Sequence, residues 1–119
     1  MTHFAVVGTG YWGENHARVG AQLLDEGVGT DLTLCDKDEE RVSEIAERYS
    51  VDYTTDAGSL ADVGVDVAVI ATPSQTHHKL GSDLLNDGID LLIEKPLALT
   101  TDDAIDLVQQ AEDEGQTLA

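Results

Sequence analysis

The feature that most constrains this 119-residue chain is a run of closely spaced glycines directly after its first apolar segment. The run, Gly8-Thr9-Gly10-Tyr11-Trp12-Gly13, lies between residues 4–7, which are apolar like a buried strand, and residues 14–26, which are typical of a helix. Glycines at this spacing in a strand-to-helix turn are typical of folds that bind dinucleotides. We therefore predict that the free N–H groups at the helix start hold a pyrophosphate. A plain turn without a ligand is the alternative.

Each glycine has its own predicted role. Gly8 permits a tight turn, and Gly10 leaves no Cβ between the backbone and the pyrophosphate. Gly13 lets the helix pack close to the strand. Trp12 is open to two interpretations, because it can flank the pyrophosphate or the adenine, or it can pack on the first helix.

An acidic residue, Asp36, ends the second predicted strand, 23 residues after Gly13. A carboxylate at this position can accept hydrogen bonds from both hydroxyls of an adenosine ribose, and it repels a 2′-phosphate. The sequence therefore favours NAD over NADP as the cofactor. Lys37 leaves the NADP alternative open, because a basic side chain beside the acid can reach a 2′-phosphate, although a solvated lysine is the simpler interpretation.

Apolar and amphipathic segments alternate along the whole chain, which is typical of a parallel sheet with crossover helices. The predicted fold is therefore a single α/β domain with a doubly wound parallel sheet of the Rossmann type. Its cofactor would lie at the carboxyl edge of the strands, where the topology switches between the first and fourth strands. Later strands are predicted at residues 31–35, 51–53, 67–71 and 91–93, and a short helix or turn at 56–62.

Three further helices are predicted from apolar spacing and from capping residues. Ser74 can cap a helix that runs to about Asp87, with Gly88 past its end. Thr100 and Asp103 approximate a capping box for the last helix, which Gly115 ends. The second helix is expected to bury Val42, Ile45, Ala46 and Tyr49, and the last helix Ala104, Leu107, Val108 and Ala111.

The composition is strongly acidic: 24 Asp and Glu residues against six Lys and Arg give a formal net charge of −18. Such a surface repels nucleic acid and anionic membranes, and it favours a halophilic protein adapted to high salt. The clear periodicity of its apolar residues argues against disorder. No apolar run approaches the roughly 20 residues that span a bilayer, and no secretory signal is present, so a cytoplasmic protein is expected. The single cysteine, Cys35, is interpreted as a small buried side chain.

Two further motifs follow the fourth and fifth predicted strands, Thr72-Pro73-Ser74-Gln75-Thr76-His77 and Glu94-Lys95-Pro96. With the glycine turn continued as Tyr11-Trp12-Gly13-Glu14-Asn15-His16, they resemble in order and spacing the N-terminal domain of the Gfo/Idh/MocA oxidoreductases, the family of glucose-fructose oxidoreductase and inositol dehydrogenase. The resemblance covers essentially the whole chain. It implies an oxidoreductase that transfers a hydride between a nicotinamide cofactor and a hydroxyl carbon of a sugar, cyclitol or sugar nucleotide.

The resemblance also implies roles for single residues. Lys95 would border the nicotinamide and orient the substrate hydroxyl or assist proton transfer, which makes it the predicted catalytic residue, and Glu94 is expected to hold it in place. Pro96 is commonly cis in this family. His77 is either a packed, hydrogen-bonded histidine or one that faces the ligand, and His16 has the same ambiguity. The full set predicted to contact the cofactor is Gly8, Thr9, Gly10, Tyr11, Trp12, Gly13, Asp36, Lys37, Thr72, Pro73, His77, Glu94, Lys95 and Pro96.

No metal site is predicted, because the adjacent His77 and His78 would point about 100° apart on a helix and no other cluster of His and Cys exists. In the family, a C-terminal α+β domain carries the substrate pocket, and that domain is absent from residues 1–119. We therefore expect one dinucleotide-binding domain, inactive alone, that ends as a further strand begins at residues 116–119. An enzyme fragment and a stand-alone redox-sensing module both remain open, and an uncovered sheet edge near Thr117 favours a homodimer.

Overall fold

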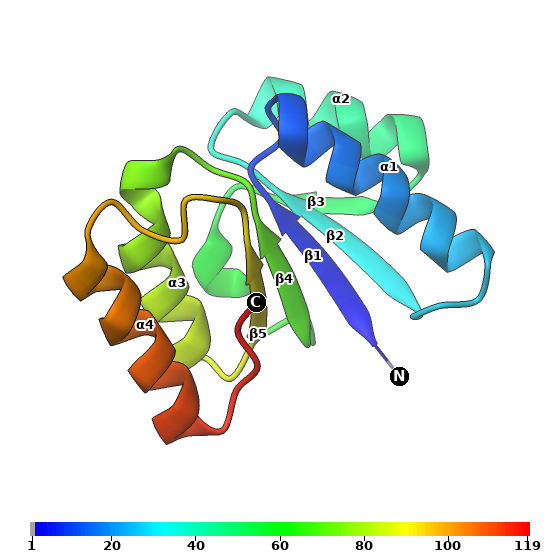
Figure 1. The fold of residues 1–119 in the computed structure, drawn as a ribbon. Helices are drawn as coiled ribbons and strands as arrows, with labels where there is room; N and C mark the ends of the chain where they lie inside the picture. The colour runs from blue at the N-terminus through cyan, green and yellow to red at the C-terminus, as the bar shows by residue number, and fades with distance from the viewer. Residues whose placement is uncertain (1) are drawn as a thin grey trace.

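The computed structural model describes residues 2–119, which form one parallel sheet with helices on both faces (Figure 1). The strands lie in the order β3-β2-β1-β4-β5, so that β1 is central and the order reverses beside it. This is the doubly wound arrangement that the sequence predicts. The strands are β1 (His3–Val7), β2 (Asp31–Cys35), β3 (Asp52–Thr54), β4 (Val67–Ile70) and β5 (Asp90–Ile93). The helices are α1 (Tyr11–Asp25), α2 (Glu39–Tyr49), α3 (His77–Asn86) and α4 (Thr101–Glu114), with short 3₁₀ turns at Ala57–Ser59 and Ser74–Thr76.

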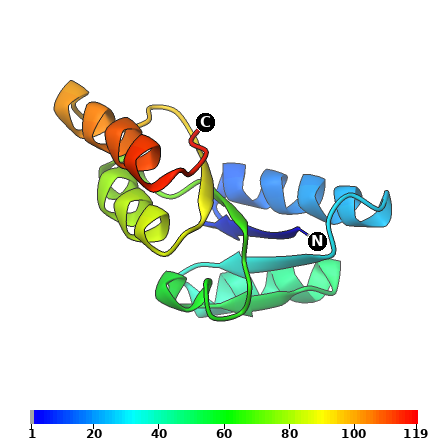
Figure 2. The same ribbon diagram turned by 90° about the horizontal axis from the view of Figure 1, so that it is seen from below.

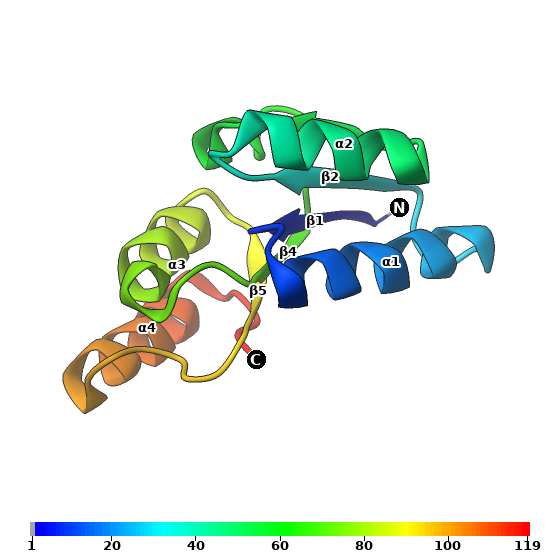
Figure 3. The same cartoon turned by 90° about the horizontal axis from the view of Figure 1, so that it is seen from above.

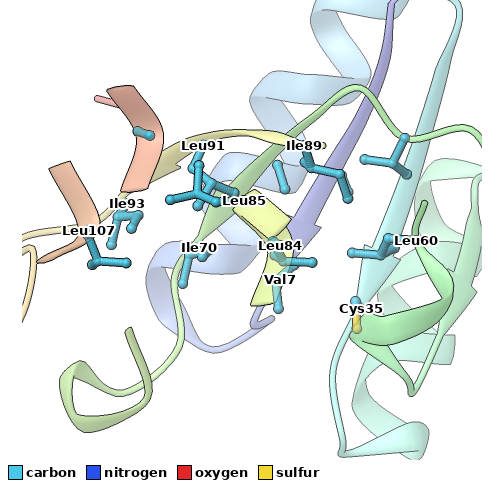
Figure 4. Close-up of a cluster of buried hydrophobic side chains, with 14 residues drawn as sticks. Val7, Cys35, Leu60, Ile70, Leu84, Leu85, Ile89, Leu91, Ile93 and Leu107 are labelled. Carbon is cyan, nitrogen blue, oxygen red and sulfur yellow. The ribbon is translucent and has the colours of Figure 1, made fainter. Parts of the chain in front are cut away.

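The side chains of the sheet divide between two hydrophobic cores. Neighbouring residues of a strand point to opposite faces, so Val6 of β1 belongs to one core while Ala5 and Val7 belong to the other. The first core lies under α1 and α2, and the second, larger one lies under α3 and α4 (Figure 4). Figures 2 and 3 show the same division, with α3 and α4 side by side and apart from α1 and α2.

The predicted strands match the observed ones to within about one residue, but three helix predictions need correction. Helix α1 begins at Tyr11, directly after its N-cap Gly10, and not at Glu14. Ser74 does not cap α3, because residues 74–76 form a 3₁₀ turn and the helix begins after it. Val108 is 44% exposed and lies outside the buried stripe of α4, whose buried residues are Leu107 and Ala111.

The helix ends follow their predicted chemistry in two places. The hydroxyl of Thr100 accepts a hydrogen bond from the N–H of Asp103 over 3.1 Å, as a cap of α4 should. Gly115 ends the same helix with φ +69, a left-handed conformation that favours glycine.

The last residues of the chain extend the sheet. Leu118 pairs in parallel with Leu91 of β5, and the N–H of Leu91 donates to the carbonyl oxygen of Thr117 over 2.9 Å. The residues predicted to begin a further strand therefore form an isolated bridge beside β5, and the sheet that the described residues form has five strands. Within residues 2–119, none of the helices has the length and apolar character that a bilayer crossing needs.

Candidate cofactor site

The glycine turn lies at the carboxyl edge of the sheet, between β1 and α1. Gly8 has φ +95, and a Cβ there would lie 2.8 Å from the carbonyl carbon and oxygen of Ala71. The turn therefore packs directly against the backbone that follows β4. At Gly13, a Cβ would lie 1.6 Å from the carbonyl oxygen of Gly8, so the absence of a side chain lets α1 pack onto the turn itself.

Gly10 differs from the other two glycines, because no atom lies within 4 Å of the position that its Cβ would occupy. The first helical hydrogen bond of α1 runs from the N–H of Glu14 to the carbonyl oxygen of Gly10 over 2.8 Å. The N–H groups at the start of the helix have no side-chain cap. Open space in front of free N–H groups and the positive end of a helix dipole fits a pyrophosphate.

The carboxylate of Asp36 lies across the turn from this helix start. Its Oδ2 accepts hydrogen bonds from the N–H and the hydroxyl of Thr9, over 2.8 and 2.7 Å, and from Nη2 of Arg41 over 2.7 Å. Its Oδ1 accepts one from the N–H of Asp38 over 3.0 Å. Thr9 is itself 1% exposed, so it fixes the carboxylate from inside the protein.

These bonds keep Asp36 ionised. Burial raises the pKa of its carboxyl, but the hydrogen bonds from Arg41, Asp38 and Thr9 together outweigh burial and lower the pKa to about 2. The neighbouring Cys35 behaves in the opposite way, because burial and the charges of Asp36 and Asp56 raise the pKa of its thiol to about 11. Cys35 is thus the small buried side chain that the sequence predicts, and its raised pKa keeps the thiol protonated.

A groove of about 580 Å³ opens beside Asp36 at the carboxyl edge of β1, β2 and β4. It brings together five of the residues predicted to contact the cofactor, Gly8, Asp36, Lys37, Thr72 and Pro73. Four polar residues of the next turn and helix, Gln75, Thr76, Lys79 and Asp83, also line it. Lys37 is exposed at its rim. The groove is mainly apolar with a few polar side chains, and its volume is large enough for a nucleoside.

The Glu94-Lys95-Pro96 turn follows β5 at the same edge but does not line the groove. Lys95 is exposed, and the bond between Lys95 and Pro96 is cis. Glu94 does not hold Lys95, contrary to the sequence-based expectation, because its Oε1 lies 2.6 Å from Nε2 of His16 in α1. The turn is therefore tied to the helix that starts at the glycine cradle.

The structure places His77 as the packed alternative, not as a residue facing a ligand. Its side chain is 1% exposed, its Nδ1 lies 2.8 Å from the carbonyl oxygen of Pro96, and its Nε2 lies 2.9 Å from that of Thr72. Both ring nitrogens are thus taken up by the backbone. His77 joins the two loops that flank the site and leaves no ring nitrogen for the cofactor.

Tyr11 and Trp12 lie outside the groove at the start of α1, 76% and 61% exposed. Their rings meet edge to face, with centroids 5.1 Å apart. Trp12 therefore stacks on Tyr11 and is largely open to solvent. Among the described residues, no group of three His, Cys, Asp or Glu side chains is arranged to hold a metal ion.

Sequence reasoning missed two residues of this site. Arg41 stands five residues after Asp36 and one turn into α2, a position that i,i+5 spacing alone does not single out. Its guanidinium, and not the Lys37 ammonium, is the cation that contacts the acid. The sequence offers His16 only as a packed or a ligand-facing residue. Its contact with Glu94 is missed because the two residues are 78 positions apart.

Comparison with known proteins identifies the domain. Residues 2–119 match the model of the Gfo/Idh/MocA oxidoreductase family, NAD-binding Rossmann fold. Inositol 2-dehydrogenase 1 of Saccharopolyspora erythraea is 32% identical over 118 residues, which cover 95% of this chain and 34% of that protein. The chain spans about a third of the length of the curated relatives it matches.

Two solved structures are similar over nearly the whole chain. GenD2 from gentamicin A biosynthesis, solved in complex with NAD, has a TM-score of 0.89 and 34% identity, covering 99% of this chain and 33% of its own. UDP-N-acetylglucosamine 3-dehydrogenase GnnA of Acidithiobacillus ferrooxidans has a TM-score of 0.87 and 26% identity, covering 98% and 38%. The family match, the parallel sheet and the glycine cradle agree, and this chain belongs to the Gfo/Idh/MocA oxidoreductases as their NAD-binding Rossmann domain.

Proposed function

We propose that residues 1–119 form the cofactor domain of a two-domain enzyme that transfers a hydride between NAD(H) and a hydroxyl carbon of a sugar, cyclitol or sugar nucleotide. One observation carries the proposal: the open glycine cradle, the ionised Asp36 and the Lys95 turn all lie along one edge of the sheet. Inositol 2-dehydrogenase and UDP-N-acetylglucosamine 3-dehydrogenase are relatives whose names fit this substrate class.

Different residues of the chain would bind different parts of the cofactor. The N–H groups after Gly10 would bind the pyrophosphate, and Asp36 would accept from the adenosine ribose in the groove between β2 and β4. Thr72 and Pro73 would form the opposite wall of that groove. Gly8, Thr9 and Gly13 shape the turn, while Tyr11 and Trp12 would flank the phosphates at its open side.

We propose NAD, and not NADP, as the preferred cofactor. Asp36 is 12% exposed in its side chain and ionised, so a 2′-phosphate beside it would meet a fixed negative charge. Arg41 is the residue that could offset this repulsion. Lys37, at the groove rim, is the second candidate for that role.

Lys95 is proposed as the residue that meets the substrate. The bound nicotinamide accepts or supplies the hydride. In the reductive direction an ammonium at Lys95 would donate a hydrogen bond and then a proton to the substrate oxygen, and in the oxidative direction a neutral amine there would accept the hydroxyl proton. Glu94 and Pro96 complete the turn that presents Lys95 from the end of β5.

The chain alone is proposed to bind the cofactor without turning over substrate. Orienting two reactants can supply several kcal/mol of barrier lowering, and within the described residues 2–119 Lys95 is exposed and does not line the groove. The second candidate function is a stand-alone redox-sensing module. An exposed Lys95 fits such a module equally well, and a reading frame that stops after codon 119 would favour it.

We also propose that the protein is adapted to high salt, lies in the cytoplasm and forms a homodimer. The net charge of −18 supports a protein adapted to high salt, and the single free, buried Cys35 fits a reducing cytoplasm. A homodimer is supported by the sheet edge at residues 117–119 and by the exposed Ile105 and Val108 of α4. Light scattering in 2 M KCl that shows only monomer would reject the dimer.

Calorimetric titration of NADH and NADPH into the purified chain tests the cofactor proposal. We expect NADH to bind more tightly. Tighter binding of NADPH would overturn the role of Asp36. Steady NAD-dependent oxidation of a polyol or sugar by this chain alone would show that the catalytic residues are misplaced.

A further inference from the structure

Two histidines from two different helices reach the Glu94-Lys95-Pro96 turn, one on each side of Lys95. Nε2 of His16, in α1, lies 2.6 Å from Oε1 of Glu94. Nδ1 of His77, the first residue of α3, lies 2.8 Å from the carbonyl oxygen of Pro96. The residue between the two anchored ones is the exposed Lys95.

The contacts of His77 bear on which of its ring nitrogens carry an N–H group. Its second nitrogen, Nε2, lies 2.9 Å from the carbonyl oxygen of Thr72, and both carbonyl oxygens can only accept hydrogen bonds. A neutral imidazole carries one N–H, so it can satisfy one of these contacts and must set a lone pair against the other oxygen. An imidazole with N–H groups on both nitrogens would satisfy both contacts of this side chain, which is 1% exposed.

The charges around His77 are compatible with a cation. The loop of residues 71–76 carries no ionisable side chain, and the turn contributes Glu94 and Lys95. On α3 the neighbours are Lys79 and His78, and α4 adds two acids beside His78. Burial and the positive end of the α3 dipole oppose the charge, whereas two charge-assisted hydrogen bonds and a chain of net charge −18 favour it.

We propose that His16 and a doubly protonated His77 are positioning residues that hold the turn from both sides and so set where Lys95 lies. This rests on the proposed function of Lys95. His16 joins Glu94 to α1, the helix that begins at the glycine turn of residues 8–13. The distance between the Glu94-Lys95-Pro96 turn and the glycine turn is therefore fixed. His77 joins Pro96 to Thr72, which lines the groove. Neither histidine needs to touch the cofactor.

Titration with two ligands tests the consequence for binding. ADP-ribose has the adenosine and pyrophosphate of NADH but lacks the nicotinamide that Lys95 would border. His16→Leu and His77→Leu are each expected to weaken NADH binding at least fivefold while ADP-ribose binding changes less than twofold. His16→Gln, which restores an N–H donor toward Glu94, should recover most of the loss. His78→Gln, on the same helix but bonded to Asp106, is the matched control and should change neither ligand.

The outcomes separate the two proposals. Failure of the wild-type chain to bind either ligand rejects the proposed function. Equal losses for both ligands, or no loss for NADH, reject the positioning role while leaving the cofactor site intact. If His77→Leu does not fold, the comparison of His16→Leu with His16→Gln still decides.

Nuclear magnetic resonance of the ¹⁵N-labelled histidine rings tests, without any ligand, whether both ring nitrogens of His77 carry protons. At pH 7 we expect both ring nitrogens of His77 to show the shifts and attached protons of an imidazolium. The partly buried ring of His78, which contacts Asp103 and Asp106, serves as a reference in the same spectrum. One protonated and one unprotonated nitrogen at His77 would reject the proposal that a doubly protonated His77 holds the turn, whether or not NADH binds.

Discussion

Nη2 of Arg41 lies 2.7 Å from Oδ2 of Asp36, the same oxygen that accepts two hydrogen bonds from Thr9. Three donors leave this oxygen no room for a ribose hydroxyl. Thr9 is buried, while the side chain of Arg41 is 47% exposed, so Arg41 is the donor that can leave. An adenosine ribose that bound at Oδ2 would therefore compete with Arg41 for this oxygen.

This competition predicts how the two nicotinamide cofactors respond to substitution. Asp36→Ala should cost NADH about 1–2 kcal/mol, the scale of hydrogen bonds to a charged acceptor, and narrow the preference for NADH. Arg41→Ala should weaken NADPH about tenfold and leave NADH unchanged or slightly tighter. Calorimetry on both variants measures these ratios. If Lys37→Ala loses NADPH in place of Arg41→Ala, the role given to Arg41 belongs to Lys37.

The low pKa of Asp36 predicts how its contribution to stability depends on pH. The folded value of about 2 lies below the ordinary value of 3.8, so the ionised group stabilises the folded state above about pH 4. At about 1.4 kcal/mol per pKa unit, the contribution is about 2 kcal/mol, and it is lost as the pH falls from 4 to 2. Urea unfolding of the wild type and Asp36→Asn measures it. A difference that persists undiminished at pH 2 would contradict the assignment.

The three glycines should separate stability from binding. Gly10→Ala places its Cβ in open space, so the melting temperature should hardly change while NADH binding falls at least tenfold. Gly13→Ala places its Cβ 1.6 Å from the Gly8 carbonyl oxygen, which should destabilise the fold by several kcal/mol. Thermal melts and NADH titration distinguish the two. Gly20→Ala, in the same helix as Gly13 but away from the turn, is the control, because its Cβ would meet only methyl groups of Leu32 at 3.2 and 3.3 Å.

The net charge predicts that stability rises with salt. Repulsion among the acids opposes the compact state, and the Debye length falls to about 3 Å at 1 M salt, which screens its long-range part. The melting temperature should climb between 0.1 M and 3 M KCl. A flat or falling curve would remove the interpretation as a halophilic protein.

Most of the fold could be predicted from the sequence because local patterns dictate it. The strand at residues 67–71 and the stripe of Val42, Ile45 and Ala46 follow from apolar spacing, and both are present. The start of α1 was placed too late, because Tyr11 and Trp12 are exposed and carry no periodic signal. Val108 was misplaced because its spacing fits the stripe of α4 although the helix turns it outward.

The candidate site also has features that the sequence predicts and features that it does not. Gly8, Gly13 and Asp36 lie where the motif requires, since their roles depend on backbone geometry within one strand-turn-helix unit. The pairing of His16 with Glu94, and the choice between a packed and a ligand-facing His77, could not be predicted, because they depend on how helices from distant parts of the sequence meet. Side-chain partners are fixed only by tertiary packing.

The contact of Gly8 with Ala71 sets the smallest piece of this chain that could bind a dinucleotide. A peptide that stops after β3 would contain all three glycines and Asp36, yet it would lack both the second neighbour of β1 and the wall made by Thr72 and Pro73. The recognition motif is therefore shorter than the binding unit. Any dissection, permutation or graft of this domain has to carry β4 and the loop after it along with the glycines.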